Sequence, residues 1–177
     1  MPASTDARRL VLLRHAKAEQ AGGAVHGDAQ RPLALVGRRQ SGQVGLALAS
    51  AGLRPDLVLC SSSLRTRQTW ELSRGALGTD GIEVRIDEAV YHAGVDDLLE
   101  MVRALGEGVR TVLVVGHEPT MSRTAATLAG DGSDAAAVAR AHAGVPTATF
   151  SVIETTGPWW SLSAENGRLT RIVAPAH

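Results

Sequence analysis

The stretch LVLLRH (residues 10–15) places an arginine and a histidine directly after four consecutive apolar residues. A short, uninterrupted apolar run of this kind predicts a buried strand. In open α/β sheets, ligands bind just beyond the carboxyl ends of the strands. The stretch therefore predicts a strand of the sheet and, immediately after it, the edge at which a functional site is expected.

Outward from this stretch, strand-like and helix-like segments alternate along the chain. Short apolar or alternating runs predict further strands at residues 57–60, 82–86 and 111–115, and the alternation in residues 82–86 places that strand near an edge of the sheet. Apolar residues at helical spacing predict one helix from Pro32 to a stop at Gly52, and others over residues 66–72, 95–105 and 119–128. This order predicts an α/β fold with a largely parallel sheet.

The ends of the chain carry weaker patterns. Residues 1–8 are expected to form a flexible lead. Residues 130–146 predict a long loop with room for a short helix, and residues 147–153 and 159–162 predict a closing hairpin around Thr156-Gly157-Pro158. Because neither a linker nor an internal repeat divides the sequence, we predict a single domain over residues 1–177.

Composition narrows the function further. Lys and Arg total 18, as do Asp and Glu, so the formal net charge is zero and no bulk attraction to nucleic acid or to an anionic membrane is expected. No apolar stretch reaches membrane-spanning length. The only cysteine, Cys60, lies in a predicted core strand and is interpreted as a small apolar residue. We expect a cytoplasmic, monomeric protein.

The polar residues that follow the predicted strands share one chemistry. Each of four strands is followed by candidates for one site: Arg14 and His15; Ser61, Ser62, Ser63 and Arg65; Asp87 and Glu88; Gly116 and His117. Arginine forks suit a tetrahedral dianion, a histidine can attack phosphorus, and a serine-rich turn entering a helix offers N–H groups to an anion. No Cys, Asp or Glu cluster has metal-ligand spacing, so no metal or other cofactor is expected. Positive charge would then come from Arg14, Arg65 and a partly protonated His117.

Several strings of residues resemble the histidine phosphatase superfamily, which includes the phosphoglycerate mutases. Leu12-Leu13-Arg14-His15-Ala16 is similar to its first signature, with Ala16 where most members have Gly, as is common in the branch typified by the phosphohistidine phosphatase SixA. Further matches, in the family's order between residues 10 and 130, are Arg31-Pro32-Leu33 with Gly37 and Gln40, the segment from Ser61 to Thr69, and Val114-Val115-Gly116-His117-Glu118-Pro119.

The resemblance implies a fold and a set of roles. The fold would be a three-layer sandwich of the phosphoglycerate mutase type, with helices on both faces of a mostly parallel sheet. His15 would become phosphorylated, while Arg14, Arg65 and His117 would bind the phosphoryl group, with Ser62 counted among the phosphate-binding residues. Glu88 falls near the acid/base carboxylate of larger members. Because Glu88 is matched only with the following Gly94, its role is the least specific part of the resemblance.

Three functions compete at this point. The leading one is a metal-independent phosphatase that forms a phosphohistidine intermediate and dephosphorylates phosphohistidine in a phosphorelay or phosphotransfer protein. The second is a phosphatase of small phosphorylated metabolites, which the same short, open site would also suit. The third is a non-catalytic module that only binds phosphate or a phosphoprotein; the intact set of Arg14, His15, Arg65 and His117 argues against it.

Overall fold

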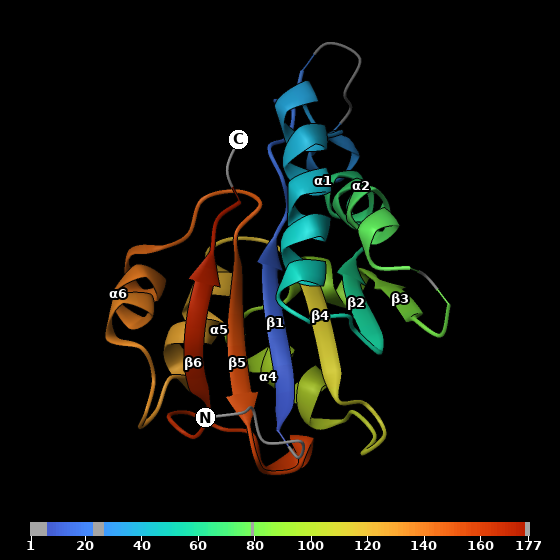
Figure 1. The fold of residues 1–177 in the computed structure, drawn as a ribbon. Coiled ribbons are helices and arrows are strands. Elements are labelled where there is room, and N and C mark those ends of the chain that lie inside the picture. Colours follow the sequence, from blue (N-terminus) through green and yellow to red (C-terminus); the bar gives the residue numbers. More distant parts are fainter. Residues whose placement is uncertain (1–6, 23–26, 79, 176–177) are drawn as a thin grey trace.

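One mixed sheet forms the centre of the molecule (Figure 1). The computed structural model describes residues 7–22, 27–78 and 80–175. Six strands lie in the order β3-β2-β4-β1-β5-β6. Their bounds are β1 (Arg8–Arg14), β2 (Leu57–Ser61), β3 (Glu83–Asp87), β4 (Thr111–Gly116), β5 (Phe150–Thr155) and β6 (Arg168–Val173). The four strands predicted in the first two thirds of the chain are confirmed.

The direction of the strands explains where a site can form. β4 runs parallel to both β1 and β2, and β2 runs parallel to β3. Only β5 runs against its neighbours β1 and β6. The carboxyl ends of β2, β4 and β1 therefore meet side by side at one edge. The mostly parallel sheet is confirmed, and β3 is an edge strand with all of its residues exposed, as its alternating pattern predicted.

Helices cover both faces of the sheet, which confirms the three-layer arrangement. They are α1 (Leu35–Ser50), α2 (Leu64–Ser73), α3 (Glu88–His92), α4 (Val95–Arg103), α5 (Thr120–Leu128) and α6 (Ala135–Ala143), with 3-10 turns η1 (Asp28–Gln30), η2 (Arg74–Ala76) and η3 (Trp159–Ser161). Figure 1 shows α1 and α2 in front of the sheet and α4 and α5 behind it. None of the helices in the described part of the chain is both long and apolar enough to cross a membrane.

The alternation of side chains along β1 divides the apolar interior into two cores. Leu10 and Leu12 pack with residues of α4, α5 and α6, whereas Val11 and Leu13 pack with residues of α1 and α2. All four side chains are at most 1% exposed, and burying each contributes about 1.5–3 kcal/mol. Cys60 is also fully buried, in the core under α1 and α2, and burial raises the pKa of its thiol to about 12. It packs as the small apolar residue that was expected.

The first predicted helix begins later than expected. Pro32 does not start α1, which begins at Leu35. Leu33 instead forms an isolated bridge with Ala18, and its N–H donates to the side-chain oxygen of Gln68 at 2.8 Å. These contacts hold the residues before the helix in an extended form. The predicted stop is confirmed, because Gly52 follows the helix with a φ of +69° that suits glycine.

The prediction of a closing hairpin is correct for its first strand and wrong for its second. β5 is its first strand, but the second predicted strand, residues 159–162, begins with the 3-10 turn η3. Trp159 is buried there, and its indole N–H donates to the carbonyl of Val109 at 2.7 Å, which fixes the turn against a distant loop. The partner strand is β6, which lies outside the predicted hairpin and pairs with β5 with a register shift between Val152 and Ile153. The short helix allowed for in residues 130–146 is α6.

The contact between α1 and α2 gives a test of the packing. A Cβ atom on Gly45 would lie 2.1 Å from the carbonyl oxygen of Ser73, so Gly45→Ala must push the helices apart. We expect a loss of about 1–3 kcal/mol in the free energy of unfolding, measured by urea titration.

Gly42→Ala is the matched control in the same helix. No heavy atom lies within 4 Å of the position of its added Cβ. Higher helix propensity should raise the free energy of unfolding by about 0.5–1 kcal/mol. Equal effects of the two substitutions would contradict a close helix contact at Gly45.

Candidate active site

His15 is fixed at the carboxyl end of β1 by main-chain bonds to two other segments. Its N–H donates to the carbonyl of Gly116, and its carbonyl accepts from the N–H of Ala148, both at 3.0 Å. Ring atom Nδ1 lies 2.7 Å from the carbonyl oxygen of Ala16. Because a carbonyl oxygen only accepts, Nδ1 carries the proton. In the neutral ring, Nε2 then holds the lone pair that a nucleophile needs.

The loop after His15 is held by residues of the first helices. The N–H of Ala16 donates to Oγ1 of Thr69, and that of Lys17 donates to Oε1 of Gln40. Gly37 lies so close to this loop that a Cβ atom there would be 2.0 Å from the carbonyl oxygen of Lys17. The motif residues Gly37, Gln40 and Thr69 thus serve to place the backbone beside His15.

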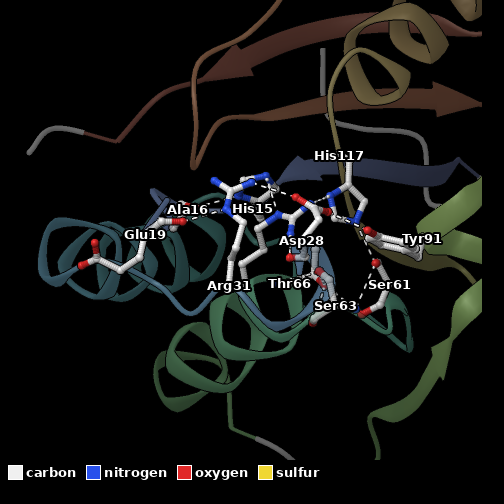
Figure 2. A network of polar contacts seen from close by, with 11 residues as sticks. His15, Ala16, Glu19, Asp28, Arg31, Ser61, Ser63, Thr66, Tyr91 and His117 are labelled. Carbon is white, nitrogen blue, oxygen red and sulfur yellow. Dashed lines mark hydrogen bonds and ion pairs between the residues drawn. The ribbon is translucent and has the colours of Figure 1, made fainter. Parts of the chain in front are cut away.

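Arg65, in the first turn of α2, joins the two histidines. Its Nε donates to Nε2 of His15 at 3.3 Å, and its Nη2 donates to Nδ1 of His117 at 3.2 Å. The two imidazole centroids are 5.4 Å apart (Figure 2). A guanidinium group has no acceptor, so both of these ring nitrogens must be unprotonated. The structure therefore brings His15, Arg65 and His117 together, as predicted.

His117 is oriented from a second direction by Ser61. With Nδ1 accepting from Arg65, the proton lies on Nε2, which donates to Oγ of Ser61 at 2.7 Å. Ser61 ends β2 and is fully buried. The ring of Tyr91 lies edge-on to the imidazole, with centroids 5.3 Å apart. Three neighbouring elements thus fix this one side chain.

Burial keeps both imidazoles neutral. Burial, together with the nearby positive charge of Arg65, lowers the pKa of His15 to about 4 and that of His117 to about 3. A neutral His15 can act as a nucleophile at pH 7. The expectation that a partly protonated His117 supplies positive charge is wrong, because a desolvated imidazole beside an arginine does not hold a second proton. The positive charge comes from the arginines.

Arg14 approaches the same edge of the sheet from β1. Its Nη1 donates to the carbonyl of Val145 at 2.8 Å, while its buried Nε has no hydrogen-bond partner among the described residues. The N–H of Val145 in turn donates to Oε2 of Glu118 at 3.2 Å. Burial lowers the pKa of Arg14, and the carboxylate of Glu118 opposes that shift. Glu118 therefore supports Arg14 through both a hydrogen-bonded chain and its charge.

Two predicted site residues do not join the cluster. The contact to His117 comes from Ser61, not from Ser62, whose carbonyl accepts from Nε of Arg67. Glu88 begins α3, its side chain is 78% exposed, and its partner is His92 at 3.5 Å. From this helix, Tyr91 rather than Glu88 contacts the cluster.

Sequence reasoning missed two polar residues that contact the cluster, Asp28 and Tyr91. Asp28 accepts hydrogen bonds from Arg65, Arg31 and the hydroxyl of Tyr91 (Figure 2). Tyr91 is the only tyrosine of the chain, and this rarity could have drawn attention to it. Asp28 lies in a polar loop without a motif that distinguishes it from its neighbours. Over the described residues, no group of three or more His, Cys, Asp and Glu side chains is placed to hold a metal ion.

The protonation states can be tested by 15N NMR of histidine-labelled protein. At pH 6, His15 should still be neutral with its proton on Nδ1, because its pKa is lowered to about 4. In urea the same ring should titrate near the ordinary value of about 6.5.

The lowered pKa of His15 also makes the stability of the fold depend on pH. Between about pH 6.5 and 4, His15 is protonated in the unfolded chain but remains neutral in the folded protein. The free energy of unfolding should therefore fall as the pH is lowered through this range. A midpoint for His15 near 6.5 in the folded protein would contradict the desolvated site.

Comparisons with known proteins agree with this geometry. A family model described as the histidine phosphatase superfamily (branch 1) matches residues 10–91. A protein of Mycobacterium tuberculosis (strain ATCC 25618 / H37Rv), named only as uncharacterized, is 38% identical over 150 residues, which are 83% of this chain and 89% of that protein.

Solved structures extend the likeness to the whole chain. A structure from Nakamurella multipartitia, provisionally assigned as phosphohistidine phosphatase SixA, is 34% identical, covers 100% of both chains and has a TM-score of 0.83. The protein histidine phosphatase SixA complexed with tungstate shares the fold at 22% identity, with a TM-score of 0.75 and coverage of 94% of this chain and 97% of that one. The chain belongs to the histidine phosphatase superfamily, in its SixA-like branch, and is a phosphatase.

Proposed function

We propose that this phosphatase removes the phosphoryl group from phosphohistidine in a phosphorelay or phosphotransfer protein, through a covalent intermediate on His15 and without a metal. The observation that carries the proposal is the environment of His15. Its Nε2 is unprotonated and lies beside Nε of Arg65, and its ring is held by the Nδ1–H bond to Ala16. This is the state and orientation that an attacking imidazole requires.

The first chemical step transfers the phosphoryl group to the enzyme. Nε2 of His15 attacks phosphorus in line, so a P–N bond forms as the bond to the leaving group breaks. Nε of Arg65 exchanges its contact with Nε2 for one with a phosphoryl oxygen, and the unpartnered Nε of Arg14 can take another. These two cations balance the negative charge of the transferring group. The leaving imidazole takes its proton from solvent.

The second step returns the enzyme to its starting state. Water attacks phosphorus, the P–N bond to His15 breaks, and the electron pair returns to Nε2. His117 can donate to the phosphoryl group from Nδ1 only after Arg65 has released that atom and the ring proton has shifted to it, with the hydroxyl of Ser61 then donating to Nε2. Inorganic phosphate then leaves, and the proton released by the attacking water goes to the phosphate or to solvent.

Two features support phosphohistidine over an ester as substrate. Imidazole is a better leaving group than an alkoxide, so a site in which Glu88 is exposed and paired with His92 has less need of a strong acid. The relative from Nakamurella multipartitia carries the same assignment at 34% identity. A phosphatase of small phosphate esters is the second candidate, favoured by the position of Glu88 one turn before Tyr91, which contacts the cluster.

The first test compares wild type with His15→Ala on two kinds of substrate. Phosphate release is recorded from a phosphohistidine-carrying phosphotransfer protein and from a panel of small phosphate esters, each with and without chelator. We expect release to be fast from the protein, slow from the esters, insensitive to chelator, and reduced about a thousandfold or more in His15→Ala.

His142→Ala is the control, because this histidine is exposed on α6 and makes no described contact with His15, Arg65 or His117. Substantial turnover by His15→Ala would contradict a covalent intermediate on His15. Fast release from esters and little from the protein would keep the nucleophile but replace phosphohistidine with a metabolite as the substrate.

A second test addresses the carboxylate on α3. If Glu88 protonates an ester's leaving oxygen, Glu88→Gln should lower ester hydrolysis by about a hundredfold while phosphohistidine hydrolysis changes little. Glu83→Gln, at the amino end of the exposed strand β3, removes the same charge at the opposite end of the strand from Glu88 and should affect neither substrate. Equal losses on both substrates in Glu88→Gln would rule out a role as the acid.

A further inference from the structure

The guanidinium of Arg65 is almost fully occupied before any substrate binds. Of its five N–H groups, Nε–H donates to His15, and the two on Nη2 donate to His117 and to Oδ2 of Asp28. One N–H of Nη1 donates to the main-chain carbonyl of Asp28 at 2.7 Å. A phosphoryl oxygen can therefore bind Arg65 at full strength only by replacing bonds that already exist.

Asp28 is the natural group to be replaced. Its Oδ2 lies 2.9 Å from Nη2 of Arg65 and 2.6 Å from the hydroxyl of Tyr91, and its Oδ1 lies 2.9 Å from Nη1 of Arg31. The hydrogen bond from Tyr91, followed by those from Arg31 and Arg65, holds the pKa of the carboxyl well below its usual range. An ionised carboxylate thus occupies N–H groups of Arg65 that an oxyanion of a substrate would also use.

The carboxylate of Asp28 is more exposed to solvent than the guanidinium that it contacts. Its side chain is 48% exposed, whereas that of Arg65 is only 6% exposed. After Asp28 moves, Arg31 can remain its partner, because the two are three residues apart in one turn. Gly27, directly before it, has a φ of +118°, a region that side chains other than glycine rarely adopt. The exchange at Nη2 therefore displaces a group that lies at the surface.

We propose that Asp28 is a specificity-determining residue of the phosphoryl site: its carboxylate competes for Arg65, so that only an anion stronger than a carboxylate displaces it. The inference rests on the proposed function. A singly charged anion gains little by replacing a carboxylate of equal charge, whereas a phosphoryl dianion gains a second charge interaction with Arg65. The same competition helps product phosphate to leave, because Asp28 returns to the donors that phosphate vacates.

The test measures phosphate affinity with Asp28 altered. Inorganic phosphate is titrated by calorimetry into Asp28→Asn and Asp28→Ala, each in the His15→Ala background so that no turnover is needed. We expect phosphate to bind on the order of tenfold more tightly in both than in the His15→Ala parent, a change of one decade in Kd. Acetate, added as a singly charged competitor, should weaken phosphate binding more in both variants than in the parent.

Two further variants separate competition from other effects. Tyr91→Phe keeps the carboxylate but removes its shortest hydrogen bond, so phosphate should bind more tightly by a smaller factor. Glu71→Gln removes one charge from the same helix as Arg65, in a surface pair with Arg74, and should leave phosphate affinity unchanged.

Unchanged or weaker phosphate binding in Asp28→Ala would overturn the inference and make Asp28 a residue that merely positions Arg65. Tighter binding in Asp28→Asn alone would overturn it too, since the new amide would then be the ligand. Failure of the proposed function is distinguishable: wild type without turnover, but with the expected shifts in phosphate affinity, would refute the catalytic proposal and leave the role of Asp28 standing.

Discussion

A single buried cation organises this site. The guanidinium of Arg65 donates to a ring nitrogen of each histidine, so it contributes to their orientation, their tautomers and their neutral charge. Such an arrangement is stable only if the backbone holds the three side chains within hydrogen-bond distance and the imidazoles remain neutral. Most other features of the molecule can be understood as meeting these two requirements.

The parallel sheet meets the first requirement. In its strand order, β4 lies between β2 and β1, and Val115 is paired with both Cys60 and Leu13. The residues that leave these three strands therefore begin at one level of one edge. The apolar side chains of β1 pack alternately into the two cores, which fixes the register, because a shift by one residue would turn each side chain to the opposite face.

Desolvation and a supporting layer of polar groups meet the second requirement. The histidines are buried enough that protonating them is unfavourable, while Asp28 and Glu118 place negative charge near Arg65 and Arg14. Each carboxylate also bonds to a different loop or helix, Asp28 to Tyr91 and Glu118 to Val145. The electrostatic balance of the site thus depends also on Asp28, Tyr91 and Val145, which belong to none of the motifs used to identify it.

The sequence by itself determined the strands of the parallel sheet, the helices between them and the residues His15, Arg65 and His117, because apolar runs and the polar residues that end them are local features. The same local reasoning failed for η3, which is held by a buried indole, and for β6, which pairs with β5 across a register shift. It also favoured Glu88 over Tyr91 and passed over Asp28, which lies 63 residues from its partner Tyr91 along the chain. Only tertiary packing decides such pairs, and with them the protonation of the histidines, because both depend on how segments distant in sequence exclude water from one another.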